Sequence, residues 1–116
     1  MAKYILLFTI FNLFLMIDSS GASHRLSGKA SYYYKQQNTA SGKWFKPHYM
    51  WCAHKTLPLG TKIRVTNVDN GKQVVVTCWD RGPYIKGRIL DLSKAAFAKI
   101  AATKKGVINV KIEIIK

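Results

Sequence analysis

Two aspartates occupy positions that suit acid–base chemistry. The chain of 116 residues has five acidic residues, and two of them, Asp80 and Asp91, each follow an apolar run within the segment VVVTCWDRGPYIKGRILDLS, residues 74–93. A carboxyl group at the end of a strand faces a loop that ligands can reach, and poor hydration raises its pKa toward that of a proton donor. The pattern therefore makes both carboxyl groups candidates for proton transfer. A structural interpretation stays open, in which Arg81 pairs with Asp80 and Arg88 pairs with Asp91.

The beginning of the chain has the three regions of an export signal. A short positive start precedes an apolar run over residues 4–17, and small residues follow at Ser20 and Ala22. This run is short for a transmembrane span, so we expect cleavage after Ala22 and a single domain over residues 23–116. The alternative is an uncleaved membrane anchor. No cysteine lies near the cleavage site, so we expect a periplasmic or secreted protein without a lipid anchor.

Two cysteines, Cys52 and Cys78, are the only ones in the chain. In an exported domain of this size, a disulfide between them is the simplest interpretation, worth roughly 3–4 kcal/mol in the chain-entropy model. Two free buried thiols are the alternative. His54 lies near Cys52 but completes no ligand spacing, so we expect no metal site. No glycine-rich nucleotide motif occurs, and we expect no cofactor.

A formal net charge of +14 indicates attraction to polyanions. For an exported protein these are an acidic cell wall and, more weakly, an anionic membrane surface, so we expect no nucleic-acid partner. Solubility is an alternative explanation for part of the charge. We expect a monomer.

Turn residues and alternating apolar residues predict a mainly β fold. The strongest signal is a hairpin, because Asn70-Gly71 separates two strand-like segments. Ser93 is a suitable cap for a short helix, and the C-terminal segment VINVKIEI alternates cleanly. Five or six short strands suggest a closed barrel, which leaves no exposed sheet edge. The expected elements are strands at 28–34, 61–68, 73–78 and 107–114, a second short strand ending on Asp91, a helix at 94–100, a loop at 35–48, and a helical turn or short strand at 50–54.

Three consecutive tyrosines place Tyr32 and Tyr34 on one face of the first strand and Tyr33 on the other. One face is expected to join the core, and the other offers rings that stack on the apolar faces of sugars. For each ring the core interpretation stays open, and Trp44 in the following loop is either exposed or packed on the barrel.

Five segments occur in an order that points to one family. GKASYYY, TASGKWF, AHKTLPLGTKIRVTN, NGKQVVV and DRGPYIKGRILDLSKAA span residues 28–114 approximately. Together they resemble the RlpA-like (rare lipoprotein A) family of septal ring lytic transglycosylases. The resemblance implies a small six-stranded double-psi β-barrel with one or two short helices, similar to that of expansins and family 45 glycoside hydrolases. It also implies cleavage of peptidoglycan glycan strands between N-acetylmuramic acid and N-acetylglucosamine, with attack by the muramic 6-hydroxyl to leave a 1,6-anhydro end.

The resemblance carries catalytic roles to Asp80 in DRGP and to Asp91 in DLS, with Asp91 matching the general acid of related barrels. His54 in AHKTLP belongs to another family motif, where it bonds a carboxylate or holds its loop. The expected substrate-binding residues are Tyr32, Tyr34, Lys43, Trp44, His54, Arg81, Tyr84 and Arg88.

One residue departs from the family pattern at a position expected to be catalytic. The family has a glutamate in T-A-(S/N)-G-E, whereas this chain has Lys43 in TASGK. An ammonium group there would lower the pKa of Asp80, which does not suit a general acid. Cys52 and Cys78 also replace residues that are usually small or apolar. Two functions are therefore weighed: an endolytic transglycosylase, and a non-catalytic, expansin-like module that binds cell-wall glycan.

Overall fold

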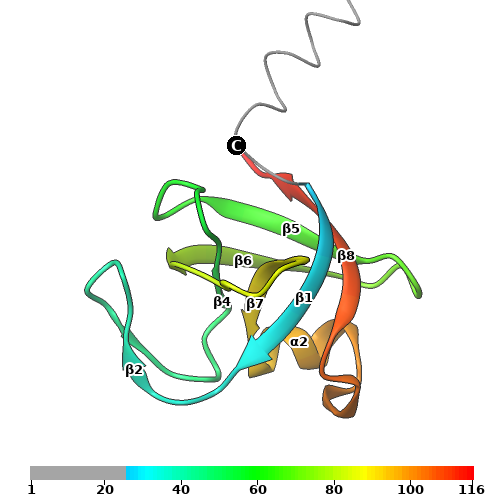
Figure 1. Ribbon diagram of the computed structural model, residues 1–116, viewed down its shortest axis with the longest axis horizontal. Coiled ribbons are helices and arrows are strands. Elements are labelled where there is room, and N and C mark those ends of the chain that lie inside the picture. Colours follow the sequence, from blue (N-terminus) through cyan, green and yellow to red (C-terminus); the bar gives the residue numbers. More distant parts are fainter. Residues whose placement is uncertain (1–25) are drawn as a thin grey trace, which may run out of the picture.

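The computed structural model describes residues 26–116, so the predicted export signal over residues 1–22 lies outside the described part. Six strands close into a barrel in the order β1-β7-β4-β6-β5-β8 (Figure 1). Their bounds are β1 Ser27–Tyr33, β4 Trp51–Ala53, β5 Lys62–Asn67, β6 Gln73–Asp80, β7 Arg88–Ser93 and β8 Ile108–Ile114. The remaining elements are β2 Gln37–Asn38, β3 Trp44–Phe45, the helix α2 Lys94–Ile100 and the 3-10 helix η1 Thr103–Lys105. The predicted mainly β, six-stranded barrel is confirmed.

Closure of the barrel depends on two parallel pairings. β1 runs parallel to β7, and β4 runs parallel to β6, whereas the other four pairings are antiparallel. The predicted hairpin is confirmed as β5 and β6, which pair from Lys62 with Thr77 to Thr66 with Gln73. β1 lies between β7 and β8, so the first and last strands of the barrel are neighbours (Figure 1).

Strand alternation fills the interior of the barrel. Side chains at every second position of the hairpin and of β8 are buried, and the intervening ones are mostly exposed. Burial of apolar surface at about 25 cal/mol per Å² is the main source of stability for such a barrel. The buried residues with this spacing are Ile63, Val65, Val74, Val76, Cys78, Ile108, Val110 and Ile112.

The helix α2 packs against the barrel through Phe97 and Ile100, which are fully buried. Ser93 caps it as predicted, because its Oγ accepts a hydrogen bond from the Ala96 N–H at 3.2 Å. At the other end, the Asn67 side-chain amide donates to the Ile100 carbonyl at 2.8 Å. The β5–β6 hairpin therefore satisfies a carbonyl at the helix terminus. Within residues 26–116, no helix has the length and apolar character needed to cross a membrane.

The ends of the predicted strands differ from the sequence-based expectation by one or two residues, and β6 continues to Asp80 rather than ending at Cys78. The strand expected to end on Asp91 continues to Ser93, because Leu92 is fully buried and both residues pair with β1. Asp91 is therefore a residue within β7 rather than a terminal one. The segment at 50–54 forms the short strand β4, and the loop at 35–48 contains the two-residue strands β2 and β3, which pair with each other.

The predicted disulfide is wrong in this structure, because Cys52 and Cys78 are free thiols. They lie directly opposite each other on the parallel strands β4 and β6, and both side chains are fully buried. Weak hydrogen bonds satisfy them: the thiols bond to each other, and Cys78 Sγ donates to the Asp80 carbonyl at 3.6 Å. Burial raises the pKa of Cys52, whereas the bond from Cys52 lowers the pKa of Cys78 to about 7.

Candidate active site

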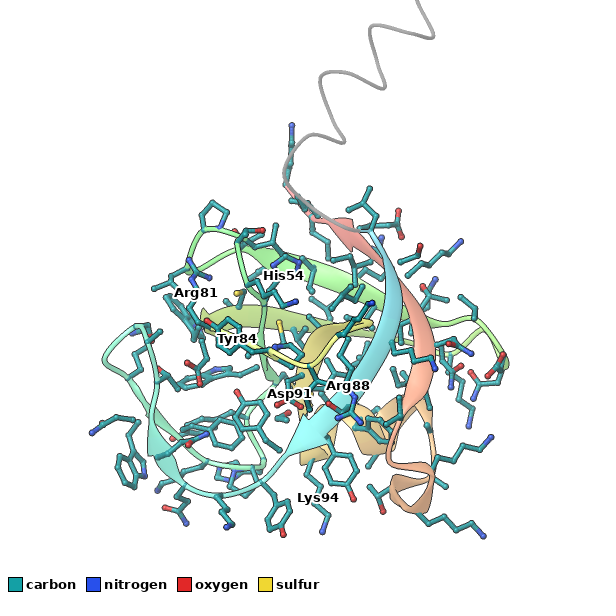
Figure 2. All side chains as sticks on the ribbon, viewed as in Figure 1. His54, Arg81, Tyr84, Arg88, Asp91 and Lys94 are labelled. Carbon is teal, nitrogen blue, oxygen red and sulfur yellow. The ribbon has the colours of Figure 1, made fainter. Side chains whose placement is uncertain are left out.

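The two predicted catalytic aspartates lie on either side of one residue of β4. Ala53 pairs with Asp80 of β6 on one edge and with Asp91 of β7 on the other. Neighbouring strands are about 4.8 Å apart, so the Cα atoms of the two aspartates are separated by roughly 10 Å. The short strand β4 thus brings together two carboxyl groups that come from different strands. Figure 2 places Asp91 beside Arg88 on β7, with His54 and Tyr84 nearby in that view.

Asp80 is the last residue of β6 and holds the loop that contains Lys43. Its Oδ1 accepts hydrogen bonds from the backbone N–H of Ala40 at 2.9 Å and of Arg81 at 2.8 Å. The Ser41 N–H also donates to the Trp79 carbonyl at 3.2 Å, which adds a backbone tie between this loop and β6. The motif TASGK is therefore fixed against the carboxyl group of Asp80.

Asp91 has the electrostatic character of a proton donor. Burial raises the pKa of its carboxyl group, and the nearby Asp80 carboxylate raises it further. The Ser31 hydroxyl, which donates to Asp91 Oδ1 at 3.2 Å, and the Arg88 guanidinium both lower this pKa. Burial is the largest of these effects, so the net shift is upward.

The guanidinium group of Arg81 does not form the ion pair with Asp80 that the structural interpretation of the sequence required. Its Nη1 donates to the carbonyl oxygens of Leu57 at 2.7 Å and His54 at 3.2 Å, while only its backbone N–H bonds Asp80. In the part of the chain that the structure describes, the one ion pair joins Arg64 and Glu113 on the barrel surface. Arg81 therefore braces the segment after β4, and its predicted contact with substrate stays a prediction.

His54 is buried directly after β4 and adjoins Asp80. Its backbone N–H donates to the Asp80 carbonyl at 3.1 Å, and its Nδ1 accepts from the N–H groups of Thr56 and Leu57, both at 3.1 Å. A ring nitrogen that accepts hydrogen bonds carries no proton, so the neutral ring has its proton on Nε2. His54 thus holds its loop through one nitrogen and has a donor on the other.

The ammonium group of Lys43 lies over the ring of Trp79, the residue that precedes Asp80. Its Nζ is 4.7 Å from the centroid of the Trp79 ring, a cation–π geometry. A row of rings continues from there: Trp79 to Trp51 at 6.3 Å, Trp51 to Phe45 at 6.2 Å, and Phe45 to Tyr33 at 4.2 Å between centroids. Lys43 therefore caps an aromatic row that ends near the two aspartates.

The structure identifies Tyr33 as a site residue that the sequence analysis missed. In residues 26–116, its hydroxyl is the one buried side-chain N or O atom without a hydrogen-bond partner. Burial raises the pKa of the Tyr33 phenol, and the charges of Asp80 and Asp91 raise it further, so the ring lies near both carboxyl groups. The two-residue periodicity of β1 was the available signal, but it did not reveal which face the site occupies.

The two neighbouring tyrosines differ in position from Tyr33, since Tyr32 precedes it on the opposite face of β1 and Tyr34 follows the end of the strand. The Tyr32 ring packs on Phe97 of α2, with centroids 4.8 Å apart, and belongs to the edge of the core. Tyr34 is 55 % exposed and lies beneath the Lys94 ammonium at 5.6 Å. The structure therefore does not bring these two predicted substrate-binding residues to the aspartates.

Two other predicted substrate-binding aromatics are exposed on loops or at strand ends. Tyr84 is 76 % exposed in the loop between β6 and β7, and Trp44 is 49 % exposed. Trp44 Nε1 donates to the Gln36 side chain at 3.2 Å, which fixes the ring at the β2–β3 hairpin. Both rings are available to a ligand. Among the described residues, no cluster of histidine, cysteine and acidic side chains has the arrangement of a metal site.

Comparison with known proteins identifies the family. A family model described as "Lytic transglycolase" matches residues 25–112. The chain belongs to this RlpA-like double-psi β-barrel family. It is 49 % identical over 92 residues to the endolytic peptidoglycan transglycosylase RlpA of Vibrio cholerae, covering 77 % of this chain and 35 % of that protein. The RlpA of Pseudomonas aeruginosa strain UCBPP-PA14 is 45 % identical over 94 residues, covering 78 % of this chain and 28 % of that protein. The chain thus spans about a third of the length of these relatives.

Solved structures support the same fold. The Streptomyces papain inhibitor superposes with a TM-score of 0.62 at 27 % identity, covering 79 % of this chain and 96 % of the inhibitor. The expansin of Clavibacter michiganensis superposes with a TM-score of 0.66 at 23 % identity, covering 78 % of this chain and 50 % of the expansin. The double-psi β-barrel implied by the sequence motifs is therefore confirmed.

Proposed function

We propose that this domain is an endolytic transglycosylase that cleaves peptidoglycan between N-acetylmuramic acid and N-acetylglucosamine. The observation that carries the proposal is the pairing of Asp80 and Asp91 with the two edges of Ala53, together with burial that raises the pKa of Asp91. A buried acid beside a second carboxyl group suits cleavage of a glycosidic bond. The names of the RlpA relatives support the same activity.

The proposed reaction needs one proton donor and one proton acceptor. The Asp91 carboxyl group gives its proton to the glycosidic oxygen, which leaves as the 4-hydroxyl of N-acetylglucosamine with the electron pair of the broken C1–O bond. The muramic 6-hydroxyl oxygen bonds to C1, and its proton passes to the Asp80 carboxylate. No water is consumed, and the product is a 1,6-anhydro end. Proton exchange with solvent then restores both carboxyl groups.

Several neighbours support this assignment of roles. The backbone N–H groups of Ala40 and Arg81 fix the orientation of Asp80. Ser31 fixes Asp91 from the adjoining strand. Preorganised groups of this kind lower the reorganisation needed during the reaction. In this proposal, the exposed rings of Trp44 and Tyr84 contact the substrate.

The second candidate function is a non-catalytic module that binds cell-wall glycan. The observation that favours it is Lys43, which replaces the expected glutamate and stacks over Trp79 at the end of the aromatic row. Stacked rings and a cationic surface would hold a glycan without cleaving it.

The place of action follows from the substrate. Peptidoglycan lies outside the cytoplasm, so we propose that the protein acts there after removal of residues 1–22. In this proposal the glycan strand is the partner, and the charge of +14 adds a weak attraction to anionic membrane surfaces.

The deciding experiment incubates the mature protein with purified, peptide-stripped glycan and identifies soluble products by mass spectrometry. We expect products with 1,6-anhydromuramic ends, and a loss of about 100- to 10,000-fold in rate for Asp80→Asn and Asp91→Asn. Asp69→Asn, in the exposed β5–β6 turn, is the matched control and should keep full activity. Products with reducing ends would indicate a hydrolase instead. Binding without release would favour the binding module.

The role of Lys43 is tested by two substitutions in the same assay. Lys43→Glu restores the carboxylate of the family motif beside Asp80, and we expect it to raise the rate. Lys43→Gln removes the charge without adding an acid and should leave the rate close to that of the natural chain. Equal rates for all three proteins would mean that catalysis does not involve this position.

A further inference from the structure

A basic hollow opens next to the proposed active site, with a volume of about 350 Å³. This size lies at the lower end of the range for small-ligand sites. Its lining brings together three cationic side chains and one histidine, and it contains no acidic residue. The lining residues are His54, Lys55, Thr56, Lys86, Gly87, Arg88 and Ile89.

Backbone hydrogen bonds shape both walls of the hollow. On one wall, the N–H groups of Thr56 and Leu57 donate to His54 Nδ1 and form a tight turn. On the other wall, the Arg88 N–H donates to the Ile85 carbonyl at 3.1 Å, and Gly87 has a φ of +85° that favours glycine. The hollow therefore belongs to the folded architecture rather than to the positions of long side chains alone.

Arg88 connects this hollow to the active site. Its guanidinium is close enough to lower the pKa of Asp91, and Figure 2 places the two side chains next to each other on β7. Lys55 and Lys86 extend the positive charge away from Asp91, and neither is in an ion pair, since the one salt bridge of residues 26–116 lies elsewhere. The hollow thus has an unmatched positive charge beside the proposed proton donor.

We propose that the hollow is a subsite for a carboxylate carried by the glycan substrate, bound by Lys55, Lys86 and Arg88. This inference rests on the proposed function, because it assigns the hollow to a muramic residue held near Asp91. Ammonium and guanidinium groups form strong charge-assisted hydrogen bonds with carboxylates. Two sources of the carboxylate share this chemistry: the lactyl group of N-acetylmuramic acid, which is free when the peptide has been removed, and the carboxyl groups of the stem peptide.

The first test measures binding of N-acetylmuramic acid and of N-acetylglucosamine, which lacks the carboxylate, by NMR titration of the mature protein. We expect shifts around the hollow with N-acetylmuramic acid alone, and a dissociation constant that rises with salt. The double variant Lys55→Gln with Lys86→Gln should weaken this binding about tenfold. The matched control, Lys104→Gln with Lys105→Gln, changes the same charge in η1 and should bind as the natural chain does. Equal affinity for both sugars, or equal weakening by both double variants, would overturn the proposal.

The second test separates the two sources with polymeric glycan. Three samples are compared in a pull-down: peptide-stripped glycan, the same glycan with its lactyl carboxylates converted to methyl amides, and intact peptidoglycan. If amidation abolishes binding, and neither added peptide nor added salt restores it, the lactyl group is the source of the bound carboxylate. If intact peptidoglycan binds more tightly than stripped glycan, and the Lys55→Gln, Lys86→Gln double variant loses this gain, the stem peptide is the source of the bound carboxylate. If the variant binds all three samples as the natural chain does, the subsite is refuted.

These outcomes are independent of the catalytic assay. Formation of anhydro products with no effect of the double variant on binding would leave the proposed activity intact and refute the subsite. Carboxylate-dependent binding without anhydro products would refute the activity and retain the subsite in a binding module.

Discussion

Replacing Tyr33 with phenylalanine should increase the stability of the domain. Its hydroxyl is buried and has no hydrogen-bond partner, although it is near the carboxyl groups of Asp80 and Asp91. A buried polar group that is left unpaired costs about 1–3 kcal/mol. Tyr33→Phe removes this group but keeps the ring and its stacking on Phe45.

The expected gain is about 1 kcal/mol, at the lower end of that range. For a domain of this size, about 1 kcal/mol corresponds to a rise of roughly 4–8 °C in Tm. Urea unfolding followed by tryptophan fluorescence gives the free energy of unfolding, and calorimetry gives Tm. Tyr34→Phe is the matched control, since its ring is 55 % exposed and it should change stability by less than about 0.5 kcal/mol.

The same variant also has a readout in activity. If the Tyr33 hydroxyl bonds the substrate between the two aspartates, its removal should lower kcat/KM about 3- to 10-fold, the value of one neutral hydrogen bond. A stability–activity trade-off of this kind is common at functional sites. The reasoning is refuted if Tyr33→Phe lowers stability by about 1 kcal/mol or more, because the hydroxyl would then have a partner in the folded protein.

Three further predictions concern the helix cap, the buried acid and the thiols. Ser93→Ala removes the hydrogen bond to the Ala96 N–H and should cost about 1 kcal/mol in urea unfolding, whereas Ser93→Gly should cost only a few tenths. Asp91 binds its proton more tightly in the folded chain, so its contribution to stability is full below its ordinary pKa of 3.8 and is lost as the pH rises through the higher folded pKa. Asp91→Asn should therefore be more stable than the natural chain at neutral pH but not at pH 3, and an equal difference at both values would contradict this sign. Cys52 and Cys78 should each take up one alkyl label in denaturant without reductant and none in the folded protein, and an unlabelled denatured chain would indicate a disulfide.

Local signals in the sequence predicted several elements of the fold correctly. The Asn70-Gly71 turn and the alternation around it define the β5–β6 hairpin, and Ser93 caps α2 as expected. These elements depend on neighbouring residues, so sequence patterns are sufficient to find them. The family motifs added the barrel topology, which includes parallel pairings between distant strands.

Features set by tertiary contacts were harder to predict. The two-residue period of β1 correctly predicted that Tyr33 and Tyr32 lie on opposite faces of the strand. Which of these faces the site occupies depends on where β7 and α2 pack. Lys43 was expected to act on Asp80, yet its ammonium group lies over the Trp79 ring, which comes from a strand far along the chain.

The cysteines illustrate a different limit. Their number and the expected export favoured a disulfide, and the structure does place Cys52 opposite Cys78. Proximity was therefore predicted correctly, but the bond was not. Their thiols remain free in the core with weak hydrogen bonds, which composition does not reveal.

The neighbouring positions of β1 and β8 have a consequence for how the chain folds. Ser27 and Gly28 pair with β8 alone, so the beginning of the first strand has no partner until the last strand has been synthesised. The β5–β6 hairpin is built from contacts close in sequence, but barrel closure waits for contacts between distant parts of the chain. Such topologies fold slowly, on a timescale of about milliseconds to seconds. A chain that crosses a membrane from its N-terminus would therefore remain open during passage and close only after its C-terminal strand has emerged.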